Sequence, residues 1–349
     1  MSIDYLPLIA PVNRDEVLQF KRESRLNAKP WAHSTLAATV LTVLIGVAVA
    51  AVIIGVFATV IPIAYVSFAS GGPVAAPVVI VPLLVIAIGA VAAYRYIRHA
   101  SGRWESLLRR TRFATANQLM YSPGTRNPDY PGLIFTHGDA RHTLDNYYSL
   151  SEPRFDIANY RYTTGSGKEK TTHNWGYLAL KLGRRLPHMV LDARGNNGLF
   201  GGSTLPTSFR GNQKLSLEGD FDKHFTLYCP REYERDALYV FTPDLMALLI
   251  DESSAFDVEI VDDWMFVYSV EPLALDQAKV VHRMFRIIDT VGAKTLRQTH
   301  RYADERIGDS SVDLVAPRGQ RLKKGSAFAG VGLIVVFAWV AFSFARTWF

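Results

Sequence analysis

Three side chains in the segment His-Gly-Asp-Ala-Arg-His have the types and spacing of metal ligands. His137, Asp139 and His142 would supply two imidazole nitrogens and one carboxylate, a donor set that suits a divalent transition metal. The same segment has the composition of an ordinary polar loop, in which two histidines need no metal. We therefore expect a structural loop here and keep a membrane-bound, metal-dependent hydrolase as an alternative function.

Alternating carboxylates occur at two further places. Glu218, Asp220 and Asp222 project from one face if their segment is extended, and Asp257 and Glu259 do the same in a later stretch with the composition of a strand. Oxygen clusters of this kind suit Ca²⁺ or Mg²⁺. A solvated strand face has the same pattern, and we expect solvent exposure at both places. The sequence thus predicts no resident cofactor.

Signatures of nucleotide binding and of hydrolysis are incomplete. Segment 164–168 resembles a phosphate-binding loop, but Glu169 stands where a Walker loop needs Ser or Thr, and Tyr162 where it needs the first glycine. A hairpin turn explains this segment better. The glycines of segment 194–202 lack the dinucleotide-binding spacing and predict a surface loop. Cys229, the one cysteine, predicts a buried and inert thiol.

Long uncharged segments flank the elements that would position these residues. Positions 34–67 contain no Asp, Glu, Lys or Arg, and a second uncharged stretch covers 68–94. As a helix, about 34 residues extend roughly 50 Å, whereas the hydrocarbon core of a bilayer is roughly 30 Å thick. Gly and Pro residues separate the two stretches and predict a turn between membrane helices at about 38–66 and 76–97. A third uncharged stretch, 325–345, predicts a C-terminal span.

Basic residues flank all three predicted spans and predict their orientation. Four of them precede the first span at positions 21–29, whereas the loop between the first two spans has no charge. The positive-inside rule then places the N-terminus and the central region in the cytoplasm and the C-terminus outside the plasma membrane. The membrane-proximal basic residues that flank the central region are Arg95, Arg98, Arg103, Arg109, Arg110, Arg112, Arg318, Arg321, Lys323 and Lys324.

This placement of charge bears on the partners of the protein. The net charge of +6 does not predict nucleic-acid binding, because most of the excess lies beside the spans and faces anionic lipid headgroups. Small residues at four-residue spacing, such as Gly46 and Ala50, suit close helix packing and leave a homo-oligomer open. The spans have no ionisable residue at mid-depth, which disfavours a channel or transporter subunit, the second alternative function.

The predicted fold class is α+β, with three transmembrane helices attached to a cytoplasmic domain. We expect a cytoplasmic N-terminal segment at 1–33, a transmembrane helical hairpin at 34–98, the α+β domain at 99–316, and a basic collar with the last span at 317–349. The domain combines antiparallel strands with helices segregated to their ends.

Periodicity and turn residues place the elements of this domain. The expected strands cover 132–136, 154–163, 170–182, 187–193, 224–229, 237–241, 256–261 and 264–270. The expected helices cover 104–119, 244–251 and 275–302, and a loop covers 121–130. The last helix has a basic side that would lie either on an anionic leaflet or in solvent.

The segment Leu-Glu-Gly-Asp-Phe-Asp at 217–222, followed by Tyr228-Cys229-Pro230 and by Thr-Pro-Asp-Leu-Met at 242–246, resembles a family of bacterial membrane proteins of unknown function. The resemblance covers about half of the central region. It implies an N-terminal helical hairpin, a cytoplasmic mixed domain and a bacterial cell membrane, and it implies no activity. The C-terminal span is a departure from that family. We therefore expect a non-enzymatic multi-pass protein whose tethered domain binds a protein partner or the anionic leaflet.

Overall fold

The computed structural model describes most of the chain outside the first and third predicted spans. The described ranges are 2–26, 76–198, 202–217, 219–309 and 311–325, with scattered positions between 40 and 69. Most of the first predicted span and nearly all of the third lie outside these residues. Over the ranges just given, the structure contains no helix that is both long enough and apolar enough to cross a membrane.

The described chain divides into two units. One contains residues 2–8 together with those from Phe113 onward, and the other extends from Ile9 to Arg112. The helices are α1 (Leu6–Ile9), α2 (Arg14–Leu26), α4 (Ala76–Ala116), α5 (Phe221–His224), α6 (Glu234–Val240), α7 (Pro243–Ser253), α8 (Ala278–Ile287), α9 (Ala293–Thr299) and α10 (Pro317–Gln320). The strands are β1 (Met120–Arg126), β2 (Asp139–Tyr148), β3 (Phe155–Thr164), β4 (Thr171–Ala193), β5 (Lys214–Leu215), β6 (Phe225–Tyr228) and β7 (Asp257–Ser269).

Helix α4 belongs to both units, because the division falls within it. Its second half confirms the helix predicted from Trp104, which is buried together with Leu107 and Leu108. The helix ends at Ala116, earlier than predicted, because Gln118 adopts a left-handed conformation with a φ of 58°.

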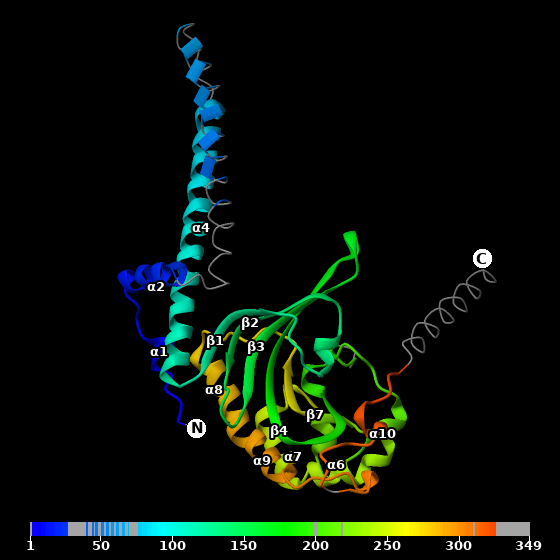
Figure 1. Cartoon of the computed structure of the whole chain (residues 1–349). Helices are drawn as coiled ribbons and strands as arrows, with labels where there is room; N and C mark the ends of the chain where they lie inside the picture. The colour runs from blue at the N-terminus through cyan, green and yellow to red at the C-terminus, as the bar shows by residue number, and fades with distance from the viewer. Residues whose placement is uncertain are drawn as a thin grey trace, which may run out of the picture. The chain divides into compact units, whose positions relative to one another are not determined.

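The seven strands form one antiparallel sheet in the order β1-β2-β3-β4-β6-β5, and β7 pairs with the other side of β4 (Figure 1). Strand β4 has 23 residues and joins the two ends of the sheet: its first part pairs with β3 and its second part with β6, while β7 pairs with both parts. The predicted α+β class is confirmed, and so is the hairpin at 165–167, where Thr164 pairs with Thr171.

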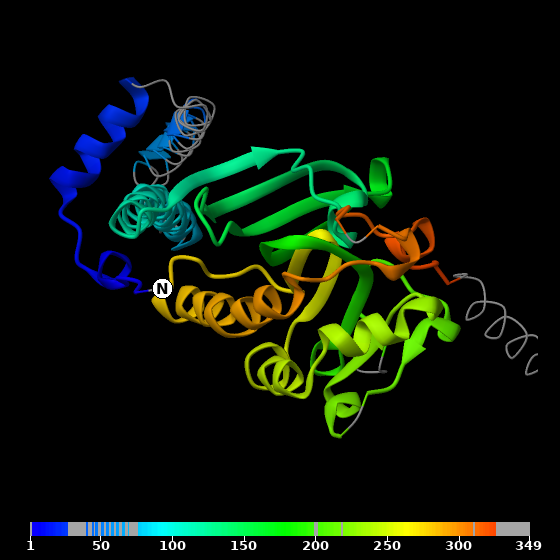
Figure 2. The ribbon, with the colours of Figure 1, turned by 60° about the horizontal axis from the view of Figure 1, so that its bottom comes forward.

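Helices α7, α8 and α9 cover one face of the sheet (Figure 2). Leu178 and Leu180 of β4 pack there in one buried cluster with Val281 and Phe285 of α8. Between α8 and α9 the chain makes a π-helical turn, Ile288–Gly292, within the long helix that the sequence predicted. A Cβ atom at Gly292 would collide with Leu180, so glycine permits this close approach of helix and sheet.

Three element predictions in this domain are wrong. The predicted loop 121–130 contains β1, an edge strand that tolerates Pro123 because its outer N–H groups need no ladder partner. The expected strand 132–136 is instead a 3₁₀ turn, Leu133–Thr136, and the polar segment after it forms β2. The expected strand 237–241 belongs to α6, whose first turn contains two acidic residues that favour a helix N-terminus.

Candidate functional site

The sheet face opposite α7–α9 carries four buried carboxylates: Asp156, Asp192, Asp257 and Glu259. Alternation along each strand separates them from the helical side. In β7, for example, Val258 and Ile260 enter the cluster beneath the helices, so their neighbours point to the other face. Strand pairing brings Asp192 of β4 and Asp257 of β7 to the same end of the ladder, beyond the pair Leu191 and Val258. This second face is therefore where the structure concentrates ionisable chemistry.

Aromatic side chains surround the carboxylates, and the 3₁₀ turn at 133–136 covers them. Phe135 from this turn lies 4.7 Å from the ring of Tyr160 and 5.0 Å from that of Tyr177, measured between ring centroids. The turn approaches the sheet so closely that a Cβ atom at Gly132 would collide with the hydroxyl of Tyr268. The second face is thus an aromatic layer that is shielded from solvent by the 3₁₀ turn Leu133–Thr136, called the cover turn below.

Asp156 receives three hydrogen bonds in this layer. The hydroxyl of Tyr130 donates to it at 2.6 Å and that of Tyr177 at 3.0 Å, and the side-chain amide of Asn146 donates to the other oxygen. Burial raises the pKa of Asp156 to about 6, and the three donors oppose that shift. Through Tyr130 this carboxylate holds the chain just before the cover turn.

Glu259 and His188 form a second buried pair. The Nε2 of His188 lies 2.8 Å from Glu259, which also accepts hydrogen bonds from the Tyr268 hydroxyl at 2.6 Å and the Leu133 N–H at 2.7 Å. The Nδ1 of His188 accepts from the Leu322 N–H at 3.0 Å, so Nε2 carries the proton that is donated to Glu259. Both ring nitrogens are occupied, and the pair therefore joins the cover turn and the C-terminal segment to the sheet instead of presenting a free base.

Asp257 and Asp192 lie at the end of the sheet beside the glycine-rich loop. Asp257 accepts a hydrogen bond from the Ala193 N–H at 2.8 Å and a longer one, 3.4 Å, from the hydroxyl of Thr204. Burial, and then the nearby charge of Asp192, raise the pKa of Asp257 to about 7. Burial also raises the pKa of Asp192. Asp257 therefore exchanges its proton close to neutral pH.

The expectation that Asp257 and Glu259 face solvent is wrong. Both are buried, because the segments around Leu133 and Leu322 cover that face of β7 from more than 60 positions away. Strict alternation offers no signal for this burial, because it places the apolar Trp264, Phe266 and Tyr268 on the face opposite Asp257 and Glu259. The irregularity at Asp262, whose φ is 53°, brings these residues to the same face.

The His-Gly-Asp-Ala-Arg-His segment lies at the edge of this layer. The Nδ1 of His137 donates to the Leu133 carbonyl at 2.8 Å, and its Nε2 lies 3.2 Å from the Thr207 hydroxyl. His142 contacts the carbonyl of Ala140 at 2.8 Å, and Asp139 begins β2 with an exposed side chain. Within the described ranges, His, Cys, Asp and Glu form no group of three that could hold a metal ion.

The acidic segment with Glu218, Asp220 and Asp222 is not extended where the structure describes it. Gly219 has a φ of 70°, and α5 begins two residues later, so Asp220 and Asp222 do not alternate along a strand. Asp220 pairs with Lys223 at 2.6 Å, whereas Asp222 accepts from the Leu217 N–H at 3.1 Å and from the Ser216 hydroxyl. Glu218 lies outside the described residues. These acids therefore complete a local turn.

Ion pairs engage part of the basic group that follows the second predicted span. Arg109 pairs with Glu105 at 2.8 Å and Arg112 with Glu16 at 3.3 Å. The side chains of Arg95 and Arg103 are exposed, that of Arg110 is half-buried, and that of Arg98 lies outside the described residues.

The basic group before the third predicted span is docked onto the domain. Arg321 makes two parallel contacts with Asp262, at 2.8 and 2.9 Å, and Arg318 pairs with Glu232 at 2.8 Å. The backbone of Lys323 exchanges two hydrogen bonds, both 2.8 Å, with the side chain of Gln213, and Lys324 forms a β-bridge with Phe209. The segment is thus fixed to the sheet up to Gly325, whose N–H donates to the Ser208 carbonyl.

The basic side of the long C-terminal helix is also largely used within the domain. Arg286 pairs with Glu252, and Lys294 pairs with Asp244 at 2.9 Å. The guanidinium of Arg283 lies 4.5 Å from the ring centre of Phe256. These contacts favour the solvated-face alternative for this helix over contact with a leaflet.

Comparison with known proteins gives a distant structural similarity and no family. No family model matches the chain, and no curated protein matches it. Among solved structures, the crystal structure of the mycobacterial trehalose monomycolate transport factor A, TtfA, is similar at 13% sequence identity, with a TM-score of 0.34. The similarity covers 55% of this chain and 90% of that one.

Proposed function

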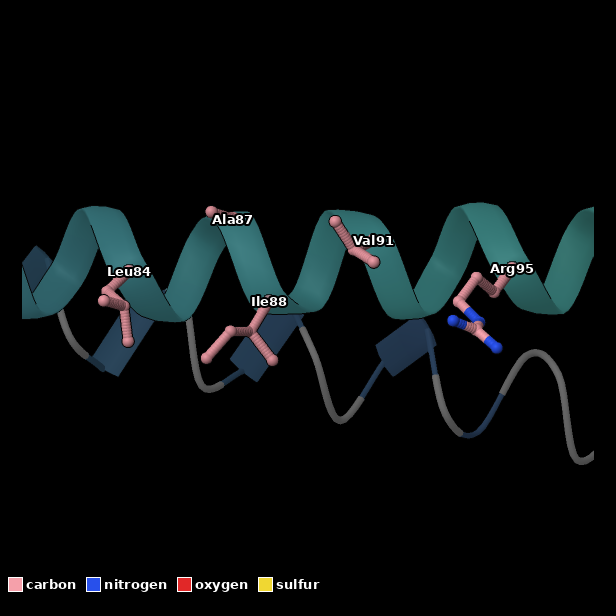
Figure 3. A pocket seen from close by; sticks show the side chains of 5 residues that line it. All are labelled: Leu84, Ala87, Ile88, Val91 and Arg95. Carbon is pink, nitrogen blue, oxygen red and sulfur yellow. The ribbon is translucent and has the colours of Figure 1, made fainter.

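We propose that this chain is a multi-pass protein of the bacterial plasma membrane, with three transmembrane helices and a cytoplasmic α+β domain that binds a protein partner. The observation that supports it most directly is an exposed apolar stripe on α4. Leu84, Ile88 and Val91 are 56%, 61% and 58% exposed, and with Arg95 they lie at helical spacing along one side of the helix (Figure 3).

The same helix changes character after Arg95. Its later apolar residues Trp104, Leu107 and Leu108 are buried, whereas Leu84, Ile88 and Val91 before it are not. Leaving a large apolar side chain in water instead of burying it costs roughly 1.5–3 kcal/mol. Lipid around the first part of α4 would remove that cost, and Arg95 would then lie at the level of the headgroups.

The other end of the domain supports a second anchor. The docked segment ends at Gly325, where the uncharged stretch 325–345 begins, so no linker separates the domain from that stretch. A span that begins there would hold the domain directly against the membrane surface.

Partner binding is supported by how the charged groups are used. Asp156, Asp257 and Glu259 already accept hydrogen bonds within the domain, and many arginines pair within the chain. The domain nevertheless exposes two adjacent large apolar residues of α6, Leu238 at 53% and Tyr239 at 41%. An exposed apolar pair of this kind is suited to contact with another protein.

Cysteine accessibility tests the membrane part of the proposal. The native Cys229 is buried and burial raises its pKa to about 12, so it can remain in place. In intact cells, a membrane-impermeant maleimide is expected to label Gly72→Cys, whereas Lys168→Cys at the β3–β4 hairpin reacts only after permeabilisation. The chain is expected to remain in the membrane fraction in alkaline carbonate. Extraction by carbonate, or labelling of Lys168→Cys in intact cells, contradicts the proposal.

Site-specific crosslinking tests the partner. A photoreactive amino acid at Leu238 is expected to give a discrete protein adduct in cells, and the same probe at the exposed polar Glu305 serves as the matched control. Equal patterns at the two positions would remove partner binding from the proposal while leaving the membrane part intact.

A further inference from the structure

We propose that α2 lies in the headgroup layer of the cytoplasmic leaflet, with Leu18 and Leu26 inserted among the acyl chains. This inference rests on the proposed membrane anchoring and adds a lipid-binding surface that precedes the first span. It concerns the unit Ile9–Arg112, within which α2 and most of α4 are packed together.

The inner face of α2 fixes the helix against α4. The ring of Phe20 meets that of Trp104 edge-on at 6.3 Å between centroids, and the ammonium of Lys21 lies 5.7 Å from the Trp104 ring centre. Glu16 pairs with Arg112 one turn earlier in α2. These contacts place α2 against the part of α4 between Trp104 and Arg112.

The outer face of α2 presents leucines that these contacts leave exposed. Leu18 is 43% exposed and Leu26 is 84% exposed. At about 100° per residue these two side chains are roughly 80° apart around the helix, with Arg22 midway between them. This pattern suits a helix in the interfacial layer, where apolar side chains enter the acyl boundary and an arginine extends its charge back to the headgroups.

The position of α2 along α4 agrees with that depth. Trp104 follows Arg95 by nine residues, which is about 14 Å along a helix axis. The uncharged stretch of the first predicted span begins only eight residues after Leu26, at Ser34, so the chain must reach the bilayer from the end of α2.

The charges of α2 indicate which force would hold this helix on the leaflet. The four basic residues of α2, which are Arg14, Lys21, Arg22 and Arg25, are accompanied by the three acids Asp15, Glu16 and Glu23, so the helix has no strong excess of positive charge. Insertion of leucines, rather than attraction to anionic lipid, would therefore hold α2 on the leaflet. We expect its membrane contact to depend weakly on salt, unlike that of a polybasic segment.

Environment-sensitive fluorescence tests the inference on the full chain. The chain is reconstituted in phosphatidylglycerol–phosphatidylethanolamine nanodiscs and labelled with NBD at Leu26→Cys or Leu18→Cys. We expect blue-shifted emission that doxyl-labelled lipids quench, with little change between low and high salt. Leu150→Cys is the matched control, because Leu150 is an exposed leucine of the domain and its probe should remain in water.

The outcomes separate this inference from the anchoring on which it rests. If the chain resists carbonate extraction but the probe at Leu26 reads water, α2 is not on the leaflet and the anchoring stands. A blue-shifted probe that doxyl lipids do not quench means that protein covers α2, which also overturns the inference. If carbonate extracts the chain, the anchoring itself fails.

Discussion

The two faces of the central sheet bury different kinds of side chain. The helix-covered face packs aliphatic and aromatic side chains, such as Leu178, Leu180 and Phe285. The opposite face buries Asp156, Asp257 and Glu259 among tyrosines and satisfies them with donors from distant segments. The stability of the first face depends on how well its side chains fill the available volume, whereas that of the second depends on protonation and hydrogen bonding. The two should therefore respond to different perturbations.

The largest expected effect is on the helix-covered face. Phe285→Ala removes a fully buried ring and should destabilise the domain by about 4 kcal/mol, because the surrounding side chains cannot fill the cavity. The thermal midpoint of the chain in nanodiscs should fall by a similar amount at pH 5 and pH 8. A fall in the thermal midpoint of Phe285→Ala that varies strongly with pH would contradict the proposed difference between the two faces.

The opposite face should make stability depend on pH. The folded pKa values of Asp257 and Asp156, about 7 and about 6, lie above those of an unfolded chain. Their contribution is therefore fully present below about pH 4 and is lost as the pH rises through 6 and 7. We expect the domain to lose on the order of 4 kcal/mol between pH 5 and pH 8.

Asp257→Asn isolates the larger part of this dependence. The variant should flatten the pH profile of the thermal midpoint, whereas Asp244→Asn, at an exposed carboxylate, should leave the profile unchanged. An unaltered profile in the first variant would mean that Asp257 does not carry the effect.

Glu259→Gln should cost about 2 kcal/mol at neutral pH. The amide keeps one acceptor oxygen but presents an NH₂ group to donors that a carboxylate accepted from, namely Leu133, Tyr268 and His188. Amide hydrogen exchange should then increase at Leu133 and Leu322 together, because both segments are held through this residue. Tyr268→Phe, which removes one donor, should have a smaller effect.

The smallest expected effect is at the surface of the C-terminal segment. Arg321→Ala removes a half-exposed pair with Asp262 and should cost no more than about 1 kcal/mol, with less effect at high salt. Its thermal midpoint can be compared with that of Arg318→Ala, which removes a single contact at a more exposed site. A loss comparable to that of Phe285→Ala would show that this segment holds the whole domain together.

The helix-covered face could be predicted largely from the sequence. Periodicity located the long helix around Val281 and Phe285, and Thr242-Pro243-Asp244 marked the start of α7. These signals are local, because the buried residues of a helix recur at every third or fourth position of the sequence. The hairpin at 165–167 was predictable for the same reason.

The carboxylate face could not be predicted, because its partners are distant in sequence. Alternation placed Asp257 and Glu259 on one face of a strand, but not the turn and the C-terminal segment that cover that face. Likewise, the composition around Pro123 and Gly124 indicated a loop, and only pairing with β2 makes β1 a strand. Tertiary contacts decided both cases.

The buried acids of β7 also act against misfolding. Sliding β7 by one residue along β4 would turn Asp257 and Glu259 into the apolar layer beneath the helices and leave Val258 and Ile260 among the tyrosines. Such a slipped pairing would bury two carboxylates without donors, at a cost of several kcal/mol. A strand as long as β4 offers many near-equivalent alignments to its neighbour, and these two charges make a single alignment strongly preferred.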